Sequence, residues 1–265
     1  GNGYYNGFVC DETCEGSLSG IECVESVELS IELHEGANLM SFSPEPSMSV
    51  EPALILYYFP RACSLAVHIA LEESGLDYER RIVHLPSKQN HSPAYLATNP
   101  NGAVPALTID QNTLTETQAI LTYVGDQCPG EALMPPPGDF RRYRAHEWMN
   151  FLSSSVHTYV RSIFRSTVYA GEDNATCLAV NAQGVKNLAK ATAIIERRLG
   201  DQTWALGDAF SVADAYLFVM YLWTTDERVS SVPERPRWDA LAKRVWQRPA
   251  VQRVVAIERQ DRNYE

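Results

Sequence analysis

The chain has 265 residues, of which 45% are hydrophobic, and a formal net charge of -11. This composition supports one or two domains with a substantial core, and the negative charge excludes the basic surface on which nucleic-acid binding depends. No apolar run approaches the roughly 18 residues of a membrane-spanning helix, and the first residues lack the pattern of a signal peptide, so we expect neither nucleic acid nor a membrane as a partner.

The first 52 residues differ in composition from the rest of the chain. Residues 1–50 contain nine acidic residues and no Lys or Arg, which gives -9 and leaves -2 for residues 51–265. The start, rich in Gly, Tyr and Asn, is typical of a loop. Apolar and polar residues alternate at 27–33, which predicts an amphipathic strand. Residues 43–52 are rich in Ser and Pro and indicate a linker. This acidic extension is either an appendage without a structural role or an edge strand that binds a partner.

Six cysteines are spread over the chain without a recognisable framework. Cys10 and Cys14 lie four residues apart, but no further Cys or His completes a zinc pattern. We therefore expect no metal site. Scattered cysteines without a secretory signal are typical of the reducing cytoplasm, where we place the protein.

Regular patterns begin at Leu54. A buried strand at 54–58 is followed by a helix at 64–74, which Gly75 closes because glycine readily adopts the left-handed conformation that ends a helix. The next predicted elements are a strand at 78–85, a helical turn at 93–97, a turn at 99–102, strands at 106–109 and 113–114, and a helix at 117–127. This order predicts a thioredoxin-like α/β domain over residues 53–131.

After a Pro-Pro-Pro-Gly linker at 135–138, every pattern is helical. Ser211 and Asp214 have the spacing of a capping box, which we interpret as purely structural. The predicted helices span 139–169, 175–199, 211–224, 237–247 and 249–259. The sequence therefore predicts an all-α domain over residues 139–265, and an α/β plus all-α fold for the chain.

Cys63 stands between the first predicted strand and the helix that starts at Ser64. A thiol at a helix N-terminus meets free N–H groups and the positive end of the helix dipole, which favour the thiolate and lower the pKa below about 8.5. The alternative is a small buried core residue, because cysteine is among the residue types most often buried.

Two further segments could bind an extended peptide. A cis bond between Val104 and Pro105 would leave the Val104 N–H and C=O free to pair with a ligand as a strand does, although Pro105 could equally be an ordinary trans proline at a strand edge. Glu116 and Thr117 precede a helix whose N–H groups can bind an anion, with Glu116 available to an ammonium group. The alternative for Thr117 is plain N-capping.

These segments together resemble the bacterial beta-class glutathione transferases. The resemblance is carried by residues 57–71, 99–107 and 114–120, continues through 146–151 and 206–216, and covers about residues 53–259. It implies the glutathione transferase fold, glutathione as co-substrate, conjugation of its thiolate with small hydrophobic electrophiles in detoxification, and a homodimer.

The resemblance also implies a role for individual residues around glutathione. Cys63, Ser64 and His157 lie near the sulfur and stabilise the thiolate; Val104 and Pro105 pair with the cysteinyl part, Glu116 and Thr117 hold the γ-glutamyl end, Lys88 meets the glycyl carboxylate, and Asn150 faces the sulfur.

Helical spacing supports the assignment of Asn150 and His157 independently. They lie seven residues apart, about two turns, and so share one face of a helix, with Tyr143 and His146 on the same side. A polar stripe of this kind can line a cleft, although His157 could instead be a satisfied core histidine. The electrophile would then lie between the domains, against Tyr159, Phe164 and Tyr221.

Two other functions fit the same residues. One is a Cys63-dependent enzyme that exchanges thiols with glutathione, cleaves ethers or removes halogens. The other is a non-catalytic binding module of the same fold, in which the acidic extension contacts a partner.

Overall fold

The computed structural model describes residues 3–5, 8–10, 54–128, 133–229 and 231–262. The chain divides into two compact units, residues 1–49 and 50–265. In the first unit, β1 (Gly3–Tyr5) pairs antiparallel with β2 (Phe8–Cys10), so the loop expected at the start is wrong for these residues. The strand expected at 27–33 and the linker at 43–52 lie outside the described residues.

A four-stranded sheet in the order β4-β3-β5-β6 opens the second unit. The pair β3–β4 is parallel and the pairs β3–β5 and β5–β6 are antiparallel. The strand predicted at 78–85 is three residues too long, because the Val83 N–H donates to the carbonyl oxygen of Tyr58, the last residue of β3, and no strand partner follows. The strands are β3 (Leu54–Tyr58), β4 (Tyr78–Ile82), β5 (Ala106–Ile109) and β6 (Asn112–Thr115).

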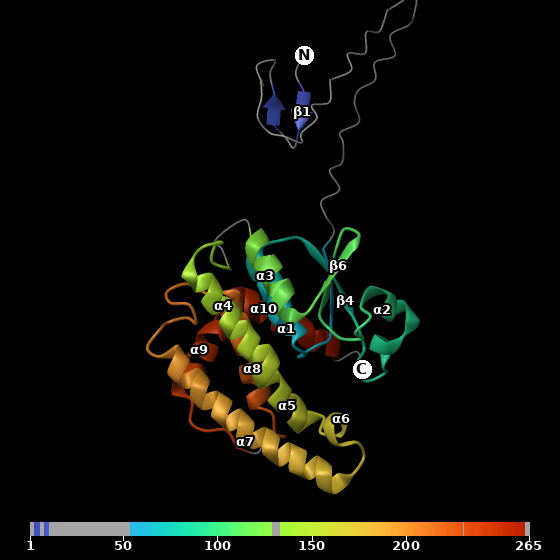
Figure 1. Ribbon diagram of the computed structural model, residues 1–265, viewed down its shortest axis with the longest axis vertical. Coiled ribbons are helices and arrows are strands. Elements are labelled where there is room, and N and C mark those ends of the chain that lie inside the picture. Colours follow the sequence, from blue (N-terminus) through green and yellow to red (C-terminus); the bar gives the residue numbers. More distant parts are fainter. Residues whose placement is uncertain (1–2, 6–7, 11–53, 129–132, 230, 263–265) are drawn as a thin grey trace, which may run out of the picture. The chain divides into compact units, whose positions relative to one another are not determined.

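Helices complete the thioredoxin-like part in the predicted order. Gly75 ends α1 with φ 72°, as expected, and Ser92 caps α2 by accepting from the Tyr95 N–H. Figure 1 shows α1 and α3 beside the sheet, and α2 at its edge near β4. The helices are α1 (Ser64–Ser74), η1 (Gln89–His91), α2 (Pro93–Thr98) and α3 (Thr117–Gln127).

The remaining part is helical, as predicted, but its first helix is not continuous. The helix expected at 139–169 contains a π-helical turn and breaks at Arg165, which has φ -141° and ψ 54°. No described helix is long and apolar enough to cross a membrane. The helices are α4 (Phe140–Phe151), η2 (Leu152–Val156, the π-helical turn), α5 (His157–Phe164), α6 (Thr167–Ala170), α7 (Asn174–Leu199), α8 (Val212–Thr224), α9 (Pro236–Trp246) and α10 (Pro249–Arg262).

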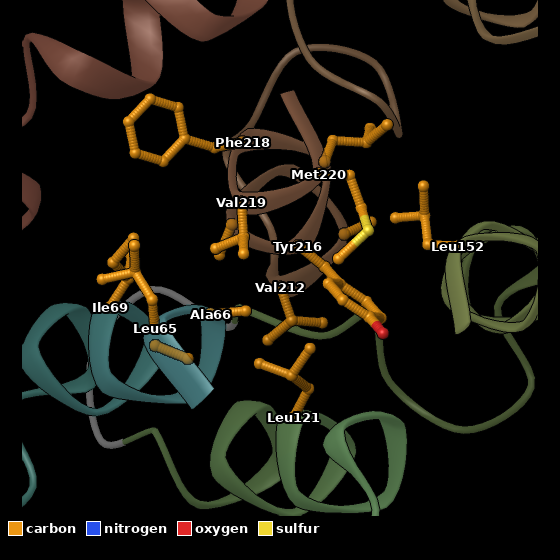
Figure 2. Close-up of a cluster of buried hydrophobic side chains, with 14 of the residues drawn as sticks. Leu65, Ala66, Ile69, Leu121, Leu152, Val212, Tyr216, Phe218, Val219 and Met220 are labelled. Atoms are coloured by element: carbon orange, nitrogen blue, oxygen red, sulfur yellow. The ribbon is translucent and has the colours of Figure 1, made fainter. Parts of the chain in front are cut away.

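Helix α8 forms the centre of the core. Its side chains meet α1 and α3 on one side and the end of α4 on the other, as Figure 2 shows. At its start the buried Asp214 carboxylate accepts from the Ala205 N–H at 2.7 Å and from the Ser211 N–H at 2.9 Å, so the predicted capping box is confirmed. Burial raises the pKa of Asp214 to about 6. Helix α8, capped in this way, packs directly against α1.

Candidate active site

Two polar contacts fix the loop between β3 and α1. The Arg61 N–H donates to the buried Glu258 carboxylate at 2.8 Å, and Arg61 adopts φ 63°, a left-handed conformation. The Ser64 hydroxyl donates to the Phe59 carbonyl oxygen at 3.1 Å and accepts from the Phe59 N–H at 3.2 Å. Ser64 therefore stabilises the loop that presents Cys63.

The Cys63 thiol is buried at the start of α1. It donates to the carbonyl oxygen of Val104 at 3.3 Å. Burial raises the pKa of the Cys63 thiol above its usual range, although a hydrogen bond with the Thr117 side chain opposes this. The lowered pKa expected from the helix N-terminus is therefore wrong, because desolvation of the thiolate outweighs the helix dipole. The side chain is a neutral hydrogen-bond donor.

The Val104–Pro105 peptide bond is cis, which confirms the prediction. The loop before it is held by the Ala103 carbonyl oxygen, which accepts from the Tyr95 hydroxyl at 2.6 Å and from the Asn99 amide at 2.7 Å. The Val104 carbonyl oxygen belongs to the residue after this anchored position and accepts from the Cys63 thiol. A carbonyl oxygen has two lone pairs, so it can accept a second hydrogen bond from a ligand.

Glu116 occupies the N-cap position of α3 with a positive φ of 70° and a ψ of 121°. Its side chain makes no capping hydrogen bond. Thr117 is the first residue of the helix and is buried, so the plain N-capping interpretation of Thr117 is wrong. The N–H groups of the first turn are available to an anion, and the Glu116 carboxylate can meet a cation beside it.

These elements line a cavity of about 750 Å³. It contains six of the predicted site residues, which come from the start of α1, the cis-proline loop, the start of α3, and α5. They are Cys63, Val104, Pro105, Glu116, Thr117 and His157. Segments far apart in the sequence thus converge on one cavity, and within the described residues no group of His, Cys, Asp or Glu could hold a metal ion.

His157 lines the cavity on the helical side. Its ring packs edge-on against the Trp223 indole, with ring centroids 4.9 Å apart, and the indole N–H donates to the Arg61 carbonyl oxygen at 2.9 Å. Burial, and secondarily the charge of Arg161, lower the pKa of His157 to about 4. The imidazole is therefore neutral near neutral pH, with one nitrogen able to donate and the other to accept.

Comparisons with known proteins match both parts of the chain. Residues 52–126 match the model of the glutathione S-transferase N-terminal domain, and residues 179–247 match that of the C-terminal domain. Glutathione S-transferase GstA of Escherichia coli O157:H7 is 36% identical over 205 residues, which are 77% of this chain and 98% of that protein. The chain belongs to the glutathione S-transferase family.

Solved structures place this transferase near the beta class. It is 38% identical to the bacterial transferase BphK, solved as a ternary complex, with a TM-score of 0.67 and coverage of 77% and 98% of the two chains. It is 35% identical to the beta-class transferase of Sphingomonas chungbukensis, with a TM-score of 0.66 and the same coverage. A Sulfitobacter homologue solved with bound glutathione is 31% identical, with a TM-score of 0.70 and coverage of 76% and 96%.

Several residues predicted for the site of this transferase do not line the cavity. Lys88 is exposed and precedes η1 in a left-handed conformation. Arg228 covers the Phe164 ring, with its guanidinium carbon 3.7 Å from the ring centroid, and Arg235 covers Tyr221 at 4.7 Å. The predicted residues outside the lining are Ser64, Lys88, Asn150, Tyr159, Phe164 and Tyr221.

The π-helical turn η2 explains the position of Asn150. A π-helical turn holds more residues than the 3.6 of an α-helix, so Asn150 and His157, with η2 between them, no longer share a face. Asn150 is exposed, and so is Tyr143, which also does not line the cavity. The helical wall is instead formed by His146, Ser153, His157 and Arg161.

Sequence reasoning missed Tyr216. Its buried side chain lines the cavity, and its hydroxyl is close enough to Cys63 and Thr117 to interact with both. Figure 2 shows the ring projecting from α8 into the core. A tyrosine within an apolar helix was the available signal, because a buried phenol usually has a hydrogen-bond partner.

Proposed function

We propose that the protein conjugates the glutathione thiolate with small electrophiles. The observation that carries this proposal is the cavity wall formed by Cys63, Val104 and Thr117, which combines a thiol, the backbone of the cis-proline loop and a helix N-terminus. These are the groups that an extended tripeptide with an anionic end requires. The solved homologue with bound glutathione supports the choice of ligand.

In the proposed complex, glutathione lies along Val104 and Pro105. Its γ-glutamyl ammonium group meets the Glu116 carboxylate, and the adjoining carboxylate accepts from the Thr117 hydroxyl and the first N–H groups of α3. The backbone of Val104 pairs with the cysteinyl residue. This alignment directs the glutathione sulfur toward Cys63 and His157, which both line the cavity.

Donors around the sulfur then stabilise its thiolate form. The neutral His157 imidazole can donate one hydrogen bond, the neutral Cys63 thiol can donate one by turning from the Val104 carbonyl oxygen to the sulfur, and Tyr216 lies close to the same place. Stabilising the anion lowers the pKa of the glutathione thiol, and the cavity holds the electrophile next to it, so the chemistry depends on positioning and electrostatics. The thiolate attacks the electrophile directly, without a covalent enzyme intermediate.

A Cys63-dependent thiol exchange is the second candidate. It is favoured by the position of the Cys63 sulfur, which lines the cavity where the glutathione sulfur would arrive. The raised pKa of Cys63 argues against it, because the thiolate is the attacking species in such exchange. The other alternative, a non-catalytic binding module, is disfavoured because binding alone would not need polar groups beside the glutathione sulfur.

The proposal extends to the setting in which the enzyme works. We place it in the cytoplasm, where Cys63 and Cys177 remain reduced thiols, with detoxification as its role. We also propose a homodimer, supported by the exposed Phe140 and Tyr143 rings, which lie side by side at the start of α4 with centroids 6.3 Å apart.

Glutathione binding measured by calorimetry tests the proposed binding mode. Thr117→Val removes the hydroxyl at the start of α3 and should weaken binding about tenfold, the value of one charge-assisted hydrogen bond. Thr113→Val, at an exposed position of β6 outside the cavity, is the matched control and should bind as the wild type does. Equal affinities for all three proteins would refute the assigned role of Thr117.

A further inference from the structure

Most side chains on the helical wall of the cavity are polar. The residues that α4, η2 and α5 contribute are His146, Ser153, His157 and Arg161, and α3 adds Gln118 and Thr122 beside the apolar Ala119. Two aromatic rings that could have made this side apolar are covered elsewhere, Phe164 by Arg228 and Tyr221 by Arg235. An electrophile that is apolar all round would leave these polar groups without partners, which is unfavourable.

Arg161 is the charged residue of this wall. Most other arginines in the described chain pair with a carboxylate, such as Arg228 with Asp226 and Arg142 with Asp126. Within the described residues Arg161 has no ion-pair partner, and its side chain is exposed although it lines the cavity. It therefore lies at the rim, where a bound anion can reach it without a large desolvation cost.

The position of Arg161 relative to the reacting atoms is set by α5. Arg161 follows His157 by four residues, about one helical turn or roughly 6 Å along the axis. Its positive charge acts on the His157 ring and contributes to the lowered pKa there. Arg161 thus lies about one helical turn further along the wall than His157, where the far end of a small substrate held beside the sulfur would lie.

We propose that the electrophile of this enzyme carries an anionic group, such as a carboxylate, that Arg161 binds. This inference rests on the proposed conjugation reaction and names its substrate class. The guanidinium offers a planar pair of N–H donors that matches a carboxylate. The electrophilic carbon of the same molecule then points along the wall past His157 to the glutathione sulfur.

A matched pair of aryl chlorides tests the proposal. The probes are a chlorodinitrobenzoate, with chlorine para to the carboxylate, and its neutral methyl ester. In both reactions the carbon–sulfur bond forms and the carbon–chlorine bond breaks, chloride leaves with the bonding electrons, and the thiol proton goes to solvent. The two probes differ in charge at the end remote from the sulfur. Their intrinsic reactivities also differ, but this difference is the same for every variant, so the change in the ratio of their kcat/KM values between variants measures recognition of the anion.

Three variants distinguish anion binding by Arg161 from the general effect of removing one positive charge from the protein. Arg161→Gln should lower the acid-to-ester ratio about tenfold, mainly through the KM of the acid. Arg161→Lys keeps the charge and should retain most of the ratio. Arg165→Gln removes the same charge four residues further on, at an exposed position outside the cavity, and should leave the ratio within about twofold of the wild type.

Other outcomes overturn the inference in distinguishable ways. Equal losses for acid and ester in Arg161→Gln, or a raised KM for glutathione with both probes, would assign Arg161 to the tripeptide and contradict the proposal. An acid-to-ester ratio that Arg161→Gln leaves unchanged, with both probes still converted, would also contradict it while leaving conjugation intact. A wild type that converts neither probe and does not bind glutathione would remove the proposed function and this inference together.

Discussion

Neutral side chains surround the place where the thiolate would form. Cys63 and His157 are both driven to their neutral forms by burial, one by a raised pKa and the other by a lowered one. A neutral donor stabilises an adjacent anion without requiring a buried countercharge, which would itself be costly to desolvate. Stabilisation of the thiolate thus depends on hydrogen bonds more than on ion pairs.

The neutral state of His157 predicts a pH dependence of stability. The folded-state pKa of about 4 lies below the ordinary value of 6.5. Between these values the unfolded chain binds more protons than the folded one, so stability is fully present above about pH 6.5 and falls as the pH is lowered toward 4. Partial exposure limits this contribution to the order of 1–2 kcal/mol.

Urea denaturation at about pH 7 and about pH 4.5 measures this contribution. The wild type should lose more stability on acidification than His157→Gln, because the variant lacks the titrating group while the other groups cancel in the comparison. Parallel losses in the two proteins would mean that His157 titrates normally in the folded state.

For single residues, the sequence predicted where the site residues lie better than it predicted their burial and protonation state. The cis bond before Pro105, Glu116 at the start of α3 and His157 on the cavity wall were all predictable from local pattern and resemblance. The protonation state of Cys63 was not, because it depends on burial by α8, which lies about 150 residues further along the chain. Arg161 was not predicted, although it lies one helical turn beyond His157, the last residue of the predicted polar stripe.

At the scale of elements, Gly184 permits the close approach of α5 and α7. A Cβ at this position would lie 2.3 Å from the Ser162 Oγ and 3.1 Å from the Tyr159 carbonyl oxygen, both on α5. The close contact at Gly184 therefore fixes the position of α5 relative to α7. It thereby also fixes the positions of His157 and Arg161, which α5 contributes to the cavity wall.

Gly184→Ala should destabilise the protein by about 2 kcal/mol through overpacking, although helix propensity alone would predict a gain of about 1 kcal/mol. Thermal or urea denaturation gives the sign directly. Adding Ser162→Ala removes the nearest atom and should restore part of the loss. Stabilisation by Gly184→Ala alone would show that α5 can move away from α7 at little cost.

The sequence predicted which segments form helices and strands and where most of them end. It did not predict the π-helical turn or the break within the long helix. The bounds of α1 and α3 agree with the pattern because glycine at C′ and the turn before Thr117 mark them. The π-helical turn η2 has no local sequence signal, and it changed the face of the helix on which Asn150 lies. The break at Arg165 was also missed, because apolar periodicity continues across it into α6.

At the scale of the whole molecule, negative charge is segregated into the acidic extension, with -9 in residues 1–50 and -2 in the remainder. The transferase unit is therefore nearly neutral and can self-associate without strong repulsion. Phe140 and Tyr143, 66% and 60% exposed, are large apolar surfaces for a monomer to leave in water.

Analytical ultracentrifugation should give a wild-type mass of about twice 29.6 kDa. Replacing both Phe140 and Tyr143 by serine should shift the protein toward the monomer, because the rings lose their partner. The double variant Val168→Ser and Leu178→Ser alters other exposed apolar residues and should stay dimeric. A monomeric wild type would refute the homodimer.

The proposed conjugation requires the contacts that hold glutathione and does not require a Cys63 nucleophile. Turnover of a neutral chlorodinitrobenzene with glutathione, in the wild type, Glu116→Ala and Cys63→Ala, tests it most directly. We predict that Glu116→Ala lowers kcat/KM for glutathione by at least about tenfold, whereas Cys63→Ala keeps activity within about tenfold of the wild type. Abolition of turnover by Cys63→Ala would contradict the account and establish thiol-exchange chemistry at Cys63 instead.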